Sequence, residues 1–352
     1  MRGRGNDADH RARRRPAPRV IGASPAQLPA NEKKHDHQLK MRHARSGLLP
    51  PQPDLEGSER LVVPQVEVRA VKAVLLSLSL LASSTAQGLA QATPQEGRPV
   101  EGSRIERSQA KQRALFGEVS PTGTTQPELM QILRNLAYGD VYAIGNLDDR
   151  TRELVTLVVL TTNQTLPQIK AHTHAALNVG VSPTEMREAL YQAAAFIGFP
   201  KVINALEVVD EVLASRGIAL PLEPKATVAD HERFEKGRAI QQPIYGGRMR
   251  ENLRDLPGSL PDDVSRLVTE SFGDFYTREG LDIRTRELMI FCALATLGGT
   301  DRQLASHAEG NLKVGNSIET MASAMIQALP HVGFPRVLNA LYAIKDVKVG
   351  AN

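Results

Sequence analysis

The sequence predicts an all-α protein made of two tandem copies of one helical module. One observation is an internal repeat: Arg150-Thr-Arg-Glu-Leu154 returns further along the chain as Arg284-Thr-Arg-Glu-Leu288. A second is that residues 197–206 return as 332–341, with Gly-Phe-Pro in both blocks and almost the same offset. A third is that neither copy shows sustained apolar alternation of period two, the pattern typical of strands. The repeat is as long as a domain, so we expect two fused modules.

Apolar residues at helical spacing predict a series of helices in the first module, residues 105–216. Ser182-Pro-Thr-Glu185 is a capping box with proline at the first helical position, and Gly198-Phe-Pro200 ends the helix that it starts. The second module, residues 233–347, repeats this order after a linker rich in proline and charge. The expected helices of the first module are 127–136, 149–162, 167 to about 180, 183–197 and 201–215; the linker is 217–232, and Asn316-Ser317 stands at the corresponding cap of the second module.

The beginning of the chain differs in composition from the rest. Residues 1–70 hold 14 Lys/Arg and 8 Asp/Glu, whereas the whole chain has a net charge of +4, so the remaining residues are net −2. We therefore expect a disordered basic leader. We expect no nucleic-acid partner, because the excess of basic residues that neutralises phosphates is confined to this leader.

Residues 71–92 have the pattern of a secretory signal peptide, with Lys72, a short apolar run and Ala90-Gln-Ala92. The run is too short to cross a bilayer, so no stable membrane anchor is expected. Because signal peptides stand at true N-termini, we expect translation to start near Val71, residues 1–70 to be a mis-assigned start, and the protein to be periplasmic or secreted. A genuine leader would instead make residues 73–82 a buried helix and the protein cytoplasmic.

A glutamate and a histidine recur at matching places in the two copies: Glu153 with His172, and Glu287 with His307. An imidazole titrates near neutral pH, and a carboxylate beside it can orient the ring, so each pair is a candidate acid–base centre. A structural role for these side chains is the alternative. No metal site is expected, because His172 and His174 do not share a helix face.

These features, in this order and in two copies, resemble the carboxymuconolactone decarboxylase family. The matching positions in the first copy are Tyr138-Gly-Asp-Val-Tyr142, Arg150-Thr-Arg-Glu153, His172, Gly180 and Gly198-Phe-Pro200. Those in the second copy are Phe272-Gly-Asp-Phe-Tyr276, Arg284-Thr-Arg-Glu287, His307, Gly315 and Gly333-Phe-Pro335. The resemblance covers nearly all of residues 105–346. It implies an alkylhydroperoxidase D-like helical fold, association of subunits, and no metal or organic cofactor.

One branch of this family, the alkylhydroperoxidase D-like branch, carries Cys-x-x-Cys ahead of the histidine. In this chain the two cysteine positions fall on Thr165 and Gln168 in the first copy, and on Thr300 and Gln303 in the second. The single cysteine, Cys292, lies in an apolar helical run and is expected to be a core residue. Without a thiolate there is no nucleophile for peroxide chemistry, so thiol peroxidase activity is not expected.

The decarboxylase branch uses no thiol, and the resemblance implies that Glu153, His172, Glu287 and His307 are catalytic. Its substrates are acids, so arginines of the repeated motif could bind their carboxylates in bidentate fashion. Alternatively, these arginines form charge pairs at a helix start. The candidate substrate-binding residues are Arg150, Arg152, Arg284, Arg286, Tyr138 and Tyr142. The chain departs from the branch at Gln168 and Gln303, where a glutamate is expected, and at the two tyrosines, where tryptophans are usual.

We therefore expect a cofactor-free lyase or isomerase, of the carboxymuconolactone decarboxylase type, that acts on a small lactone or unsaturated carboxylic acid. Two alternatives stay open: a non-catalytic small-molecule binding protein with the same fold, and a lactone hydrolase that uses the same acid–base pair. Single-module relatives form rings of like subunits, so a homo-oligomer, a trimer of fused chains, is also expected.

Overall fold

The computed structural model describes residues 102–118 and 124–348, and every regular element in these two ranges is helical. This confirms the all-α fold. The predicted leader, residues 1–70, and the predicted signal peptide, residues 71–92, lie outside the described residues and stay predictions. Across the described ranges, no helix combines the length and the apolar character needed to cross a membrane.

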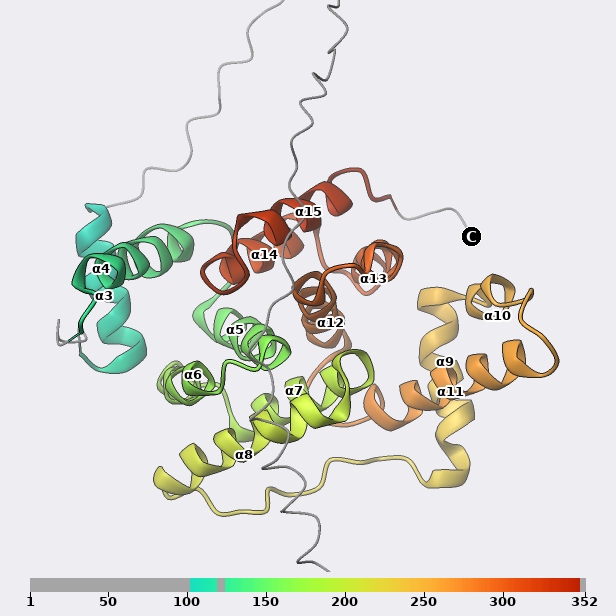
Figure 1. Ribbon diagram of the computed structural model, residues 1–352. Helices are drawn as coiled ribbons and strands as arrows, with labels where there is room; N and C mark the ends of the chain where they lie inside the picture. Colours follow the sequence, from blue (N-terminus) through green and yellow to red (C-terminus); the bar gives the residue numbers. More distant parts are fainter. Residues whose placement is uncertain (1–101, 119–123, 349–352) are drawn as a thin grey trace, which may run out of the picture. The chain divides into compact units, whose positions relative to one another are not determined.

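Each module contributes a similar series of helices (Figure 1). The first contains α3 (Arg104–Phe116), α4 (Pro127–Arg134), the π-helix η1 (Asn135–Asp140), the 3₁₀ helix η2 (Val141–Ala143), α5 (Asp149–Asn163), α6 (Leu166–Asn178), α7 (Pro183–Ile197) and α8 (Phe199–Ser215). The second contains η3 (Asp230–Glu232), α9 (Arg233–Tyr245), α10 (Arg248–Asn252), α11 (Leu260–Phe275), α12 (Ile283–Leu297), α13 (Asp301–Lys313), α14 (Ile318–Val332) and α15 (Phe334–Lys345).

The helix starts follow the capping residues of the sequence. The predicted capping box forms at Ser182, whose side chain accepts from the Glu185 N–H while the Glu185 carboxylate accepts from the Ser182 N–H. Ser317 caps α14 by accepting from the Thr320 N–H. Helix α8 begins at Phe199, slightly earlier than expected, because Pro200 is accommodated in the first turn, where its missing N–H has no helical partner to lose.

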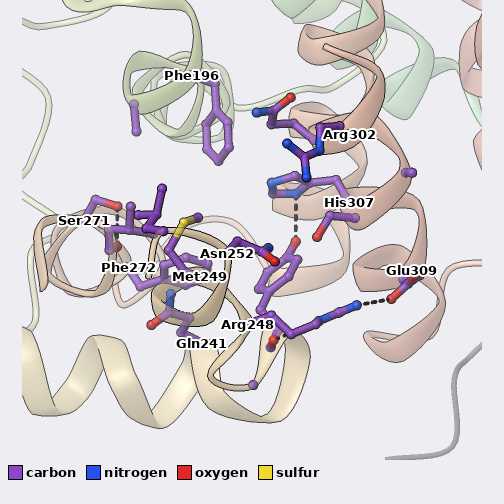
Figure 2. Close-up of a pocket in the computed structure, with 18 residues that line it drawn as sticks. Phe196, Gln241, Arg248, Met249, Asn252, Ser271, Phe272, Arg302, His307 and Glu309 are labelled. Atoms are coloured by element: carbon purple, nitrogen blue, oxygen red, sulfur yellow. Dashed lines mark hydrogen bonds and ion pairs between the residues drawn. The ribbon is translucent and has the colours of Figure 1, made fainter. Parts of the chain in front are cut away.

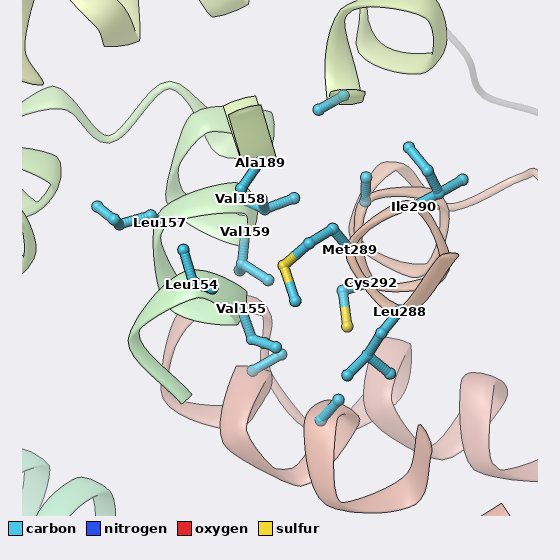
Figure 3. Packing of buried hydrophobic residues seen from close by; sticks show 14 of the residues in the cluster. Leu154, Val155, Leu157, Val158, Val159, Ala189, Leu288, Met289, Ile290 and Cys292 are labelled. Atoms are coloured by element: carbon cyan, nitrogen blue, oxygen red, sulfur yellow. The ribbon is translucent and has the colours of Figure 1, made fainter. Parts of the chain in front are cut away.

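The two modules share one hydrophobic core. Helix α5 of the first module packs along α12 of the second, and both are buried over almost their whole length. In Figure 3, Val155 and Val159 of α5 face Met289 and Cys292 of α12. Burial of this apolar surface stabilises the two copies together, at roughly 25 cal/mol per Å² removed from water.

Two polar contacts cross the module boundary in matching places. Arg152 donates to Gln327 (Nη1–Oε1 3.0 Å), and Arg286 donates to Gln192 (Nη1–Oε1 3.2 Å). The two glutamines are themselves equivalent positions of the repeat, so an arginine of each module donates to the same glutamine position of the other module. The chain therefore has the reciprocal interface of a symmetric dimer, within one polypeptide.

The structure also extends the repeat to the first helix of each module. Helices α3 and α9 pack on η1 and α11 respectively, each against a glycine. A Cβ on Gly139 would lie 2.5 Å from the Arg104 carbonyl oxygen, and one on Gly273 would lie 2.0 Å from the Arg233 carbonyl oxygen, so only glycine permits these crossings. The two helices are equally long and both begin at an arginine, and aligning their first residues pairs Phe116 with Tyr245 at their C-terminal ends.

Candidate active sites

The first candidate site is centred on Glu153 of α5, which is fully buried. Its Oε2 lies 2.8 Å from Nδ1 of His172 on α6, and its Oε1 accepts a short hydrogen bond from the Tyr142 hydroxyl. A carboxylate oxygen can only accept, so the hydrogen in this contact belongs to Nδ1, and Nε2 is the ring nitrogen left to exchange a proton with a substrate. The sequence-predicted pair is therefore brought together, with Tyr142 as a third member.

The His172 ring borders a cavity of about 600 Å³ that both modules line. Phe116 and Tyr138 pack beside it, with the Phe116 ring 5.8 Å from the imidazole and nearly perpendicular to it. From the second module, His331 at the end of α14 presents its ring at 90° to His172, with ring centres 5.6 Å apart. Thr165 and Gln168, at the positions of the missing cysteines, also line the cavity.

The second candidate site repeats this geometry around Glu287, which is fully buried on α12. Its Oε2 lies 3.0 Å from Nδ1 of His307 on α13, and its Oε1 accepts from the Tyr276 hydroxyl at 2.6 Å. The His307 ring borders a cavity of about 520 Å³. Phe196, from α7 of the first module, contacts the ring at 5.1 Å and 83°. In Figure 2, Phe196 and Met249 lie on opposite sides of this cavity.

The two sites differ in their third group. The Tyr245 hydroxyl lies 2.6 Å from Glu287 Oε2 and 2.7 Å from His307 Nδ1, so the second carboxylate is held by two phenols. Phe116 occupies the matching place in the first site and has no hydroxyl. Conversely, His331 of the first site corresponds to Phe196 of the second.

Burial fixes the protonation of the phenols. Desolvation, followed by the charge of Glu153, raises the pKa of Tyr142 well above its ordinary value. Desolvation and Glu287 likewise raise the pKa of Tyr245 and of Tyr276 far above the ordinary value. These phenols therefore stay protonated and donate to the carboxylates throughout the neutral range.

The arginines of the repeated motif have other partners. Arg152 is buried and donates to backbone carbonyls of the preceding loop, such as that of Ile144 (2.7 Å), and Arg286 does the same, for example with Arg278 (2.8 Å). The two outer arginines lie at helix starts: Arg150 pairs with Glu185 at 2.6 Å, and Arg284 donates to the Gly315 carbonyl at 2.8 Å. None of the four lines either cavity, so their predicted role in substrate binding has no support there. Tyr138 and Tyr142 do line the first cavity.

Several residues of the sites were missed from the sequence. His331 and Phe196 stand immediately before the recognised repeat blocks that contain Gly-Phe-Pro, so extending the comparison by one position would have found them. Phe116 and Tyr245 had no such signal, because the first helices share no identity block and match at a different offset. Arg302, at the start of α13, lines the second cavity beside His307 (Figure 2).

Comparison with known proteins agrees with this architecture. Residues 127–211 and 262–346 each match the Carboxymuconolactone decarboxylase family. Nitrosuccinic acid decarboxylase of Metarhizium robertsii is 31% identical over 24% of this chain, which spans 58% of that relative's length. The 4-carboxymuconolactone decarboxylase of Acinetobacter baylyi is 28% identical over 26% of this chain and 69% of its own length. Peroxisomal protein 2 of Schizosaccharomyces pombe is 28% identical over 41% of this chain and 67% of its own.

The chain therefore belongs to the carboxymuconolactone decarboxylase family, as a tandem member with two copies of the family's helical module. Membership and the two relatives named as decarboxylases support a decarboxylase-like function at the level of the family.

Proposed function

We propose that the chain is a decarboxylase of small lactone acids or unsaturated carboxylic acids, with Glu153–His172 and Glu287–His307 as its acid–base pairs. The observation that carries this proposal is the repeated geometry: in each module a buried carboxylate holds one imidazole nitrogen within 2.8 or 3.0 Å, and the ring borders a cavity. Cavities of about 520 and 600 Å³ suit a small-molecule ligand.

The reaction needs no redox step. The bond to the leaving carboxylate breaks, CO₂ departs, and the electron pair passes into the conjugated carbonyl of the substrate. The resulting enolate then takes a proton at carbon from the imidazolium of His172 or His307. The buried carboxylate stabilises that imidazolium until the transfer, and solvent afterwards restores the proton.

The apolar walls of each cavity favour loss of a charged carboxylate as neutral CO₂, because they solvate the product better than the anion. A cation is still needed to hold the acid. In the second cavity Arg302 is exposed at the start of α13, and its guanidinium has no ion pair within the described part of the chain. In the first cavity Arg134 lies among the lining residues. We propose these two arginines, rather than those of the repeated motif, as carboxylate ligands.

Thiol peroxidase activity is not part of the proposal. The positions that carry cysteines in the alkylhydroperoxidase D-like branch are Thr165 and Gln168 here, and Cys292 is fully buried in the core. Burial raises the pKa of the Cys292 thiol far above its ordinary value, so it is not a reactive thiolate.

We propose that the chains associate, because exposed apolar side chains recur at matching positions in both modules. Phe199 and Ile203 of α8 are 60% and 53% exposed, and the matching Phe334 and Leu338 of α15 are 59% and 41% exposed. Side chains of this kind are typical of interfaces. We also propose a trimer of fused chains, which native mass spectrometry of the intact assembly tests. Export to the periplasm or beyond stays a proposal as well, and mass spectrometry of the protein's N-terminus tests it.

The activity is tested by incubating the purified protein with 4-carboxymuconolactone and related lactone acids and measuring CO₂ together with the product acid. Release of CO₂ in equal amount to the product supports a decarboxylase. Ring opening without CO₂ would identify a lactone hydrolase. Saturable binding with neither product would identify a binding protein.

A further inference from the structure

His331 occupies a position that brings a second imidazole into the first cavity. It belongs to the last turn of α14 in the second module, just before the helix ends at Gly333. Its backbone is fixed from the first module, because Asn163 Nδ2 donates to the His331 carbonyl at 3.2 Å. Its ring lines the cavity and meets the edge of the His172 ring at 90°.

Packing alone does not require an imidazole at this position. In the second cavity Phe196 fills the matching place and contacts His307 with almost the same perpendicular geometry, 83° in place of 90°. A phenyl ring therefore satisfies the steric demand of the fold. The imidazole adds only hydrogen-bonding capacity, and the ring nitrogens of His331 have no hydrogen-bond partner within the described part of the chain.

The two imidazoles of the first cavity have different electrostatic surroundings. His172 Nδ1 lies 2.8 Å from Oε2 of the Glu153 carboxylate, so this ring has an anionic partner. His331 forms no ion pair with a carboxylate in the described residues, and burial together with a charge on His172 disfavours a charge on its ring. Glu118 and Arg134 also line this cavity. The two rings of the first cavity thus differ, because His172 has a carboxylate partner and His331 has none in the described residues.

We propose that His331 is a second catalytic residue of the first site, a neutral imidazole that donates an N–H hydrogen bond to the carbonyl oxygen of the bound acid while His172 protonates carbon. The inference rests on the proposed decarboxylation. When the bond to CO₂ breaks, its electron pair moves onto this carbonyl, and the N–H bond stabilises the enolate oxygen. The enolate then takes the proton of His172 at carbon, and His331 keeps its own proton throughout. The second site has no such donor from Phe196.

Three variants test the proposal in a chain whose second site is silenced by His307→Gln. His331→Phe removes the donor and keeps the shape, since phenylalanine fits the matching place, and kcat for CO₂ release is expected to fall about 10²-fold. His331→Gln retains an N–H donor that cannot titrate, so its kcat should lie within about tenfold of the parent. His174→Phe, a matched replacement of a histidine outside the cavity, should leave kcat unchanged.

Two results would overturn the proposal: a His331→Phe chain that is folded and as active as the parent, or a His331→Gln chain as inactive as His331→Phe. Nitrogen NMR of the His331 ring distinguishes a hydrogen-bond donor from a side chain that only packs. For a donor, the signals should show a neutral ring at pH 6 and an N–H signal that shifts when 4-carboxymuconolactone binds. A ring charged at pH 6 would refute the role.

Failure of the proposed function gives a different signature. If the unaltered protein releases no CO₂ from any acid tested, the decarboxylase proposal falls, and equilibrium binding of 4-carboxymuconolactone then decides the role of His331. Weakening of about tenfold in His331→Phe would support a carbonyl contact, whereas equal affinity would overturn it.

Discussion

Gly310 and Tyr245 make a contact in the second site whose energetic coupling can be measured. Gly310 lies within α13, one turn after His307. A Cβ at this position would lie 2.5 Å from the Tyr245 hydroxyl oxygen and 3.1 Å from Glu287 Oε2. The matching pair in the first module is Ala175 with Phe116, so where the phenol is absent, the methyl group is present. The glycine thus makes room for a hydroxyl that only the second site contains.

Opposing effects set the magnitude for Gly310→Ala. In an unconstrained helix interior the change stabilises by about 1 kcal/mol. Here it forces the Tyr245 hydroxyl away from Glu287 and His307, and overpacking of this kind costs about 1–3 kcal/mol, with about 1.5–3 kcal/mol more for each charged hydrogen bond broken. Because the ring can move partway without losing both bonds, we expect a net destabilisation of about 2 kcal/mol. In a Tyr245→Phe chain the same change should be neutral or stabilising by up to about 1 kcal/mol.

The assay is a double-mutant cycle in urea, with the free energy of unfolding measured for the parent, Gly310→Ala, Tyr245→Phe and the double variant. A coupling energy of about 2 kcal/mol, in favour of the double variant, is expected. Additive effects, within about 0.5 kcal/mol, would refute the steric reasoning. The double variant carries the pair that the first module already tolerates, so it should fold.

Three further predictions concern stability. Glu188 is fully buried between the modules, and its carboxylate oxygens accept from Arg278 Nε at 2.7 Å and Nη2 at 3.0 Å. Glu188→Gln should therefore lower the free energy of unfolding by about 3–5 kcal/mol in urea titrations, and a loss below about 1 kcal/mol would contradict this. Gly145 has φ +83°, and an added Cβ would lie 2.1 Å from Ser323 Oγ, so Gly145→Ala should lower the free energy of unfolding by about 3 kcal/mol. The control is Gly117→Ala, where φ is similar but the Cβ would meet open space, and it should cost only about 1 kcal/mol. Equal losses in the two variants would count against the close contact at Gly145. Burial and the nearby His172 lower the pKa of His331 to about 3, so the unfolded chain binds this proton more readily and stability is lost as pH falls from about 6.5 towards 3. Between pH 7.5 and 4.5 the parent should lose about 2.5 kcal/mol more than His331→Phe, and parallel losses would be inconsistent with a neutral buried ring.

The sequence was sufficient for the fold because its signals are local. A capping residue such as Ser182 and a break such as Gly198 act within one turn of the chain, so the helix bounds follow directly. The acid–base pairs could also be predicted, since Glu153 and His172 recur in the second copy at nearly the same spacing.

The arginines and the module boundary were harder to interpret. Arg152 and Arg286 carry charges that suggest ligand binding, yet each guanidinium satisfies loop carbonyls and a glutamine of the other module. The two glutamines lie far from the arginines in the sequence and reach them only because α5 packs against α14 and α12 packs against α7. His331 and Phe196 were hard to place for the same reason. Each lies in one module and lines the cavity of the other, so its position in a site depends on how the modules pack.

The most direct test of the acid–base account is CO₂ release from the lactone acid that the protein turns over best, compared among four chains: the parent, Glu153→Gln, Glu287→Gln and the double variant. Glutamine keeps the shape of the side chain but cannot stabilise an imidazolium. Each single variant should lose the share of turnover that belongs to its site, and the double variant should fall by about 10²–10⁴-fold. A folded double variant with parental turnover would contradict the account.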